Sequence, residues 1–151
     1  MATSISHSPA ETAALGEKWG RAVQSGLVIG LSGELGAGKT QFVKGLARGL
    51  GIPGRVLSPS FVLVNVYPGG RLTLFHLDLY RLDTPEQIAA AGLEEYLRPE
   101  GVTVVEWAER WFDSVQSPKS KVVGQTRWLR RVWIEVVSEN ERRFTYEDTG
   151  A

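Results

Sequence analysis

The chain has 151 residues and a mass of 16.6 kDa, which fits one compact domain and argues against two. With 42% hydrophobic and 23% charged residues and no cysteine, it is not expected to be wholly disordered, and disulfides, zinc–thiolate sites and a cysteine nucleophile are excluded. The 17 basic and 17 acidic residues cancel, so any contact with RNA must be local.

No targeting or membrane-spanning segment is expected. The stretch from Met1 to Ala14 has neither a basic region nor an apolar stretch. The longest apolar runs are strand-sized, well short of the roughly 20 residues that a membrane span needs. We therefore expect a cytoplasmic protein that has no membrane contact.

The first half of the chain predicts a helix, a buried strand and a second helix. Ser8 is a suitable N-cap, and Pro9 a suitable first residue, for an amphipathic helix that ends at the pair Ser25–Gly26. The apolar run Leu27–Leu31 is typical of a buried strand. A glycine-rich turn follows it, and a second amphipathic helix is expected over residues 38–50.

An antiparallel hairpin, a helix and a further strand are predicted for the middle of the chain. Phe61–Tyr67 and Leu72–Tyr80 are rich in strand-forming residues and are joined by a proline–glycine turn. Thr84 caps the next helix, which we expect to bend or divide at Gly92. The run Val102–Trp107 then predicts another buried strand.

The last part of the chain predicts a mobile loop over residues 113–127 and a C-terminal hairpin over residues 128–148. Arginines and aromatic residues interleave in this region. The pattern fits either an RNA-facing patch or a two-stranded ribbon with one solvated face. The residues concerned are Arg127, Trp128, Arg130, Arg131, Trp133, Arg142, Arg143, Phe144 and Tyr146.

The segment Gly33–Thr40 carries the strongest chemical signal, because it fits G-x-x-x-x-G-K-[ST] in full between a strand and a helix. Its glycines let backbone N–H groups surround phosphate oxygens, Lys39 reaches the β and γ phosphates, and the Thr40 hydroxyl ligates Mg²⁺. A Rossmann site is excluded because no G-x-G-x-x-G follows a strand. The residues expected to bind ATP here are Gly33, Glu34, Leu35, Gly36, Ala37, Gly38, Lys39, Thr40 and Gln41.

The fold expected from these elements is α/β. A mixed sheet of the P-loop NTPase kind would be built around the phosphate-loop strand, flanked by helices and extended by antiparallel hairpins, in a single domain over residues 1–151.

A phosphate-loop ATPase also needs a carboxylate at the end of a neighbouring strand to hold the metal or its waters. Asp78 and Glu106 are the candidates, and each could equally be a surface acid at a strand end. Their spacing does not separate their roles. His76, two residues before Asp78, is interpreted as a structural histidine within a strand.

Four motifs, in this order, resemble the TsaE family, also called YjeE, the ATPases of bacterial tRNA threonylcarbamoyladenosine synthesis. They are Gly33–Thr40, Ser58–Phe61, His76–Leu82 and Val105–Trp107, and the resemblance covers roughly residues 8–112. It implies that Glu106 and Thr40 hold Mg²⁺ and that Asp78 is needed for hydrolysis.

The resemblance also bears on three further residues. Ser60 stands where the family has a threonine, in a segment that resembles a switch region near the γ-phosphate, and it keeps the hydroxyl. The expected catalytic residues are therefore Asp78, Lys39, Glu106 and Ser60. Thr12 lies where the family meets the nucleotide's base, and Gln41 replaces a threonine often found after the phosphate loop.

The function implied by the resemblance is an ATPase subunit that supports transfer of a threonylcarbamoyl group to adenosine 37, beside the anticodon, in tRNAs reading codons that begin with A. The transfer belongs to the partner TsaD, which works with TsaB, and tRNA is reached through that complex. Hydrolysis is expected to be slow without the partners. The residues alone leave open a small nucleotide kinase, with residues 113–131 as its lid, and a module that binds ATP without hydrolysing it.

Overall fold

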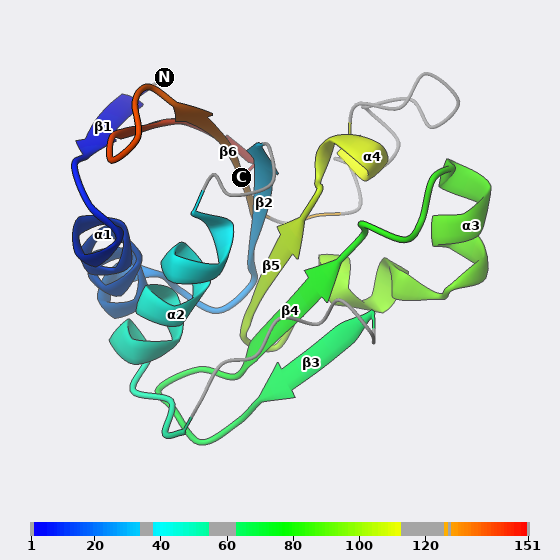
Figure 1. Cartoon of the computed structure of the whole chain (residues 1–151). Helices are drawn as coiled ribbons and strands as arrows, with labels where there is room; N and C mark the ends of the chain where they lie inside the picture. Colours follow the sequence, from blue (N-terminus) through cyan, green and yellow to red (C-terminus); the bar gives the residue numbers. More distant parts are fainter. Residues whose placement is uncertain (1, 34–37, 55–62, 113–125, 127, 151) are drawn as a thin grey trace.

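The computed structural model describes residues 2–33, 38–54, 63–112, 126 and 128–150, which form a seven-stranded sheet with helices on both faces (Figure 1). In chain order the elements are β1 (Ala2–Ser6), α1 (Pro9–Ala22), β2 (Leu27–Gly33), α2 (Lys39–Gly49), β3 (Val64–Tyr67), β4 (Leu74–Asp78), α3 (Pro85–Ala90), the 3₁₀-helix η1 (Leu93–Leu97), β5 (Val102–Glu106), α4 (Glu109–Phe112), β6 (Trp128–Val136) and β7 (Arg142–Gly150). None of the described helices is long and apolar enough to cross a membrane.

Local sequence signals place the helix boundaries. The Ser8 hydroxyl accepts a hydrogen bond from the Glu11 backbone N–H at 3.1 Å and so caps α1. Thr84 caps α3 in the same way. Gly92 adopts a left-handed conformation with φ of 70° and separates α3 from η1, which confirms the predicted division of this helix.

The sheet has the order β1-β7-β6-β2-β5-β4-β3, and its central strands β6, β2, β5 and β4 run parallel. The pairs β3–β4 and β6–β7 are antiparallel, which confirms both hairpins and the mixed α/β sheet. In the register, Glu106 lies opposite Leu31 on one side and Asp78 on the other. The carboxyl ends of β2, β4 and β5 therefore meet at one edge of the sheet, the edge where open α/β sheets bind ligands.

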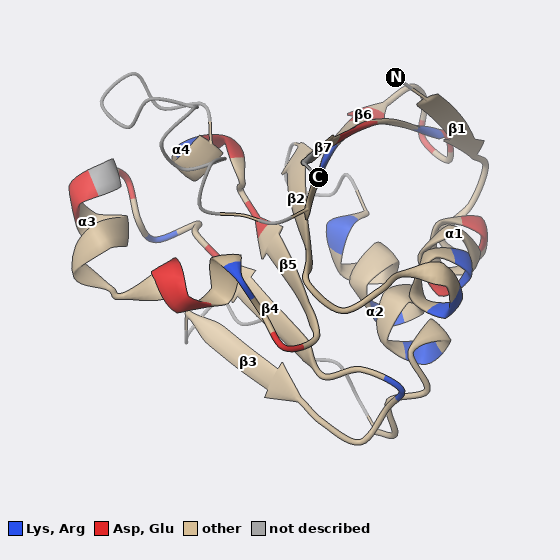
Figure 2. Ribbon diagram, turned by 180° about the vertical axis from the view of Figure 1, so that it is seen from behind, with Lys and Arg blue, Asp and Glu red and all other residues tan. Residues whose placement is uncertain are grey.

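The sheet lies between α1 and α2 on one face and α3, η1 and α4 on the other (Figures 1 and 2). Buried apolar side chains fill both interfaces. Ile29 and Leu31 of β2 point into the layer beneath α1 and α2, whereas Val28 points into the layer beneath α3, η1 and α4. This alternation follows from the two-residue period of a strand. Because β4 and β5 follow the same rule, the side chains of Asp78 and Glu106 lie on the face that carries α2.

Glycines bring α1 and α2 into backbone contact. A Cβ atom at Gly45 would lie 1.9 Å from the Ala13 carbonyl oxygen, and one at Gly16 would lie 2.2 Å from the Phe42 carbonyl oxygen. Distances this short exclude any side chain at these positions. The close packing fixes the position of α2, which begins with Lys39 and Thr40 of the phosphate-loop motif.

Two features differ from the expectations. β1 forms an antiparallel edge strand against β7, at the N-terminal segment for which no element was predicted; its pairing partner was not recognisable from local sequence. The arginine–aromatic pattern of the C-terminal hairpin is also divided between the two faces of the sheet. Arg130 packs over Trp19 and pairs with Asp148, whereas Arg131 is buried against Phe112 on the other face. These two arginines therefore do not belong to one RNA-facing surface, and Arg127 lies outside the described residues.

Candidate active site

The N-terminus of α2 carries the lysine of the phosphate-loop motif. Gly38 precedes the helix with φ of 98°, a conformation that glycine adopts without strain. The Lys39 Nζ atom donates a hydrogen bond to the Gly33 carbonyl oxygen at 2.8 Å and lies 3.9 Å from the centre of the Trp107 ring. Lys39 is thus only 4% exposed, and the two ends of the motif are joined through its side chain. Residues Glu34–Ala37 lie outside the described part of the chain.

Burial and nearby acidic side chains have opposite effects on the pKa of the Lys39 ammonium. Burial lowers the pKa of Lys39 from its ordinary value of 10.5. The charges of nearby acids oppose this shift in pKa, Glu106 most strongly, followed by Glu109 and Asp78. The structure therefore brings together three of the four predicted catalytic residues, Lys39, Asp78 and Glu106, and the fourth, Ser60, lies outside the described residues.

Asp78 and Glu106 end the neighbouring strands β4 and β5 in register, and both are nearly buried. The Asp78 Oδ1 atom accepts a hydrogen bond from the Tyr80 backbone N–H at 2.9 Å. Burial raises the pKa of Asp78 above its ordinary value of 3.8, and the charge of Glu106 raises it further. The hydrogen bond from Tyr80 and the charges of His76 and Lys39 lower this pKa in part. The Tyr80 N–H therefore holds the Asp78 carboxyl group in one orientation, while its buried surroundings disfavour the ionised form.

His76 contacts the second acid directly. Its Nε2 atom lies 2.5 Å from the Glu106 Oε2 atom, and its side chain is fully buried. Sequence reasoning assigned His76 to the strand and missed this contact. The spacing indicated part of it, because residues 76 and 78 share one face of β4. The register places Asp78 opposite Glu106 and His76 two residues earlier, opposite Val104, so His76 reaches Glu106 diagonally.

Trp107 and Arg110 complete the surroundings of Lys39. Trp107 has φ of 62°, the only positive value at a non-glycine residue in the described ranges, and its ring covers the Lys39 ammonium. Arg110 stacks near Trp107 and donates hydrogen bonds to the carbonyl oxygens of Leu79, Tyr80 and Leu82. It therefore ties the connection after β4 to α4, a role that no motif indicated.

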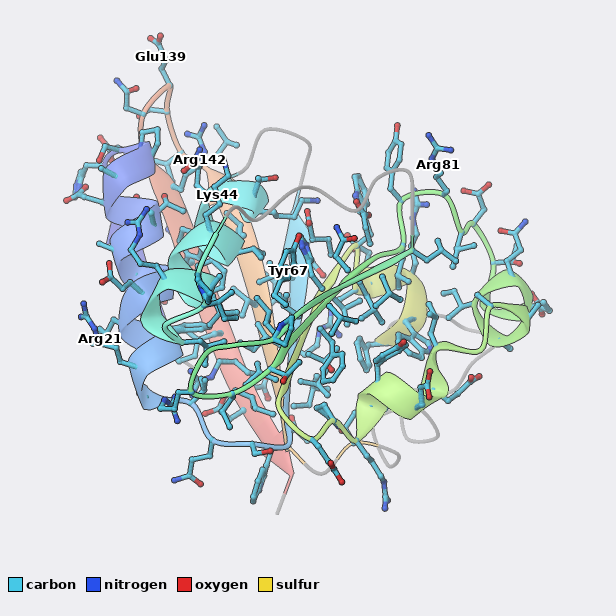
Figure 3. All side chains as sticks on the ribbon, turned by 90° about the horizontal axis from the view of Figure 1, so that it is seen from below. Arg21, Lys44, Tyr67, Arg81, Glu139 and Arg142 are labelled. Carbon is cyan, nitrogen blue, oxygen red and sulfur yellow. The ribbon has the colours of Figure 1, made fainter. Side chains whose placement is uncertain are left out.

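A small cavity of about 170 Å³ lies beside the N-terminus of α2. Its lining brings together the predicted residues Thr12, Gly38 and Gln41 with Glu139, in the turn between β6 and β7, and Arg142, the first residue of β7. Figure 3 labels Glu139 and Arg142. The contribution of this turn was missed, because no motif marks it. Thr12 is buried, and its hydroxyl lies 2.7 Å from the Ser6 hydroxyl, so β1 holds one wall of the cavity.

Thr40 and Glu106 provide the kind of donors that Mg²⁺ prefers. One is a hydroxyl and the other a carboxylate, both hard oxygen ligands, and Mg²⁺ typically adds phosphate oxygens and water to one or two such groups. Thr40 follows Lys39 at the start of α2 and is partly exposed, and the charge of Glu106 raises the pKa of Lys39 more than the charge of any other described acid does. The residues present therefore fit a magnesium ion bound together with nucleotide phosphates.

The fold and this edge of the sheet define an α/β protein whose phosphate-loop motif joins a parallel strand to a helix, with acids at the ends of the neighbouring strands. The sequence model of the family described as "Threonylcarbamoyl adenosine biosynthesis protein TsaE" matches residues 6–143. The chain therefore belongs to the TsaE family, whose proteins take part in the biosynthesis of threonylcarbamoyladenosine in tRNA.

Individual relatives agree with this assignment. The chain is 49% identical over 106 residues to the TsaE protein of Treponema pallidum. The aligned part covers 70% of this chain and 78% of the relative. The chain is 35% identical over 142 residues to the TsaE protein of Bacillus subtilis, covering 94% and 82%. The crystal structure of Bacillus subtilis YdiB superposes with a TM-score of 0.75 at 30% identity and covers 99% of this chain and 86% of that one. These relationships confirm the family that the four motifs predicted and the α/β fold that the order of helices and strands predicted.

Proposed function

We propose that this chain is the ATP-binding and ATP-hydrolysing subunit that, with TsaD and TsaB, supports threonylcarbamoyl modification of adenosine 37 in tRNAs reading codons that begin with A. The observation that carries the proposal is the burial of Lys39 between Gly33 and Trp107, facing Glu106 and Asp78. A buried ammonium whose pKa is lowered by desolvation gains most from an anion with several charges, such as a triphosphate.

ATP would bind along the edge of the sheet from the cavity to the strand ends. Its base and sugar would lie against Thr12 and Gln41, and its phosphates would meet the N-terminus of α2, where backbone N–H groups and Lys39 face them. Thr40 and Glu106 would hold Mg²⁺, which neutralises charge on the phosphate oxygens.

Hydrolysis requires a water molecule in line with the bond between the γ-phosphorus and the bridging oxygen. Attack by the water oxygen on the γ-phosphorus breaks that bond and releases ADP and phosphate, and one proton of the water must be accepted by another group. Asp78, fixed by the Tyr80 N–H, would orient this water and accept its proton, and its raised pKa favours that acceptance.

The isolated chain is expected to hydrolyse ATP slowly. Among the described arginines near the site, Arg110 is engaged with three backbone carbonyls, and Arg81 lies at the exposed connection after β4 (Figure 3). Arg142 lines the cavity assigned to the base and donates to carbonyl oxygens of the turn between β6 and β7. An arginine directed at the transition state contributes roughly 10³–10⁵ to the rate of such reactions. TsaD and TsaB would supply the missing group, order the segment that contains Ser60, or do both, and tRNA would be bound through the complex in the cytoplasm.

The direct test is a reconstituted modification reaction with tRNA, ATP, the partner proteins and this chain. Modified nucleoside is measured by mass spectrometry after digestion of the tRNA. We expect modification to require the wild-type chain and to be lost with Lys39→Ala. Equal modification without the chain would contradict the proposal, and transfer of the γ-phosphate to a nucleoside monophosphate would identify a kinase instead.

A further inference from the structure

The buried imidazole of His76 has a single hydrogen-bonded partner among the described residues, the carboxylate of Glu106. Its Nε2 atom lies 2.5 Å from Glu106 Oε2, whereas its Nδ1 atom is buried with no hydrogen-bond partner in the described part of the chain. Buried polar atoms without partners are rare because they lose hydration without compensation. If this position served packing alone, an apolar side chain would fill it without the free-energy cost of burying a polar atom that has no hydrogen-bond partner.

The contact assigns the two atoms their roles. A carboxylate oxygen accepts hydrogen bonds, so the ring N–H at Nε2 donates to Glu106 Oε2. Oε1 then remains to accept from or coordinate another group. The contact also fixes a glutamate side chain that would otherwise sample several rotamers.

We propose that His76 is the positioning residue for the magnesium ligand Glu106, and that it sets the affinity of the site for Mg²⁺ in the presence of ATP. The inference rests on the proposed function. His76 would hold one carboxylate oxygen at the end of β5, leaving the other directed at the metal beside Thr40. Partners of this kind typically change metal affinity by 10–100-fold when they are removed.

Three substitutions separate positioning from packing. His76→Gln places an amide N–H donor close to the position of Nε2, whereas His76→Asn places its amide near Nδ1, too far back to reach Glu106. His76→Leu retains the bulk and removes every donor. Calorimetry measures ATP affinity for each protein across a magnesium titration, and ADP affinity without metal in the presence of EDTA.

We expect His76→Leu and His76→Asn to need about 10–100 times more Mg²⁺ for half-maximal ATP binding, with metal-free ADP affinity within about twofold of wild type. His76→Gln should recover most of the difference. In the metal-free wild-type protein, ¹⁵N NMR should show the His76 proton on Nε2 with a low-field resonance that moves in Glu106→Gln.

Different results would contradict the positioning role of His76 and the proposed function. An unchanged magnesium requirement in His76→Leu, or equal losses of metal-free and Mg²⁺-dependent binding, would make His76 a packing residue only. Should His76→Leu not fold, the comparison of His76→Gln with His76→Asn decides the question. A wild-type protein that binds no nucleotide at any Mg²⁺ concentration would overturn the proposed function, and this inference with it.

Discussion

The interface between α1 and α2 and the carboxyl ends of β2, β4 and β5 are both densely packed, but different groups fill them. At the helix interface, glycines bring backbone against backbone, and Gly45 has no room for even a Cβ atom. At the strand ends, by contrast, a lysine, two acids and a histidine are packed together with few hydrogen bonds among them.

The helix interface should therefore determine mainly the stability of the fold, and the strand ends mainly the binding of nucleotide and metal. Substitutions at the helix interface should change the free energy of unfolding and leave the chemistry of each folded molecule intact. Substitutions at the strand ends should do the reverse, because groups that are costly to bury in the nucleotide-free protein are those that bind phosphate and metal.

Lys39→Ala should produce the largest effect. Loss of the cation that faces the β and γ phosphates should lower ATP affinity or turnover by about 10²–10³-fold, while the fold is retained. Calorimetry and phosphate release measure the two quantities. Lys44→Ala, on the exposed side of the same helix, is the matched control and should behave as wild type. A folded Lys39→Ala protein with wild-type binding and turnover would refute the phosphate-loop assignment.

Gly45→Ala should lower the free energy of unfolding by about 3 kcal/mol, because its Cβ would overlap the Ala13 carbonyl oxygen. Denaturant unfolding measures this change. Gly51→Ala is the control, since its Cβ would meet nothing within 4 Å and only its φ of 75° is unfavourable, at a cost of about 1 kcal/mol. Equal losses in the two variants would show that the clash is relieved by a shift of the helices.

Glu106→Ala and Asp78→Ala should differ in kind. Loss of a direct metal ligand should raise the Mg²⁺ concentration needed for ATP binding by roughly 10–100-fold. Loss of the acid that orients water should leave this requirement nearly unchanged and reduce turnover instead. A magnesium titration of ATP binding, followed by phosphate release at saturating Mg²⁺, distinguishes the two. The reverse pattern would exchange the roles of these acids.

Asp78→Asn should stabilise the nucleotide-free protein by about 1 kcal/mol at neutral pH. Because the folded-state pKa of Asp78 is raised above 3.8, its ionised form costs stability at pH values above the folded pKa. That cost falls as pH decreases through the folded pKa and vanishes below 3.8, where both states are protonated. Thermal unfolding across this pH range should show the advantage of the variant shrinking towards acid; a variant less stable than wild type at pH 7 would contradict the sign.

Much of the site could be predicted from the sequence because its chemistry is local. The phosphate-loop motif, its position between strand and helix, and the acids at two strand ends each lie within a short stretch of chain. The parallel register then brings Asp78 and Glu106 together. The hairpins and the break at Gly92 were predictable for the same reason, since turn and cap residues mark them.

The parts that were missed depend on contacts between distant segments. β1 exists because β7 pairs with it, and the turn between β6 and β7 reaches the cavity beside Thr12 only in the folded chain. The division of Arg130 and Arg131 between two faces follows from strand alternation, but their partners Trp19 and Phe112 come from other elements. The predicted mobile loop at residues 113–127 lies outside the described residues, apart from Thr126, and stays a prediction.

The central claim is that the strand-end site hydrolyses ATP and is completed by its partners. The most direct measurement is steady-state phosphate release by wild type and Ser60→Ala, each alone and with saturating TsaD and TsaB. We predict slow release by the isolated chain, clear stimulation by the partners, and a larger loss for Ser60→Ala in the stimulated reaction than in the basal one. Equal rates with and without the partners would contradict a partner-completed site.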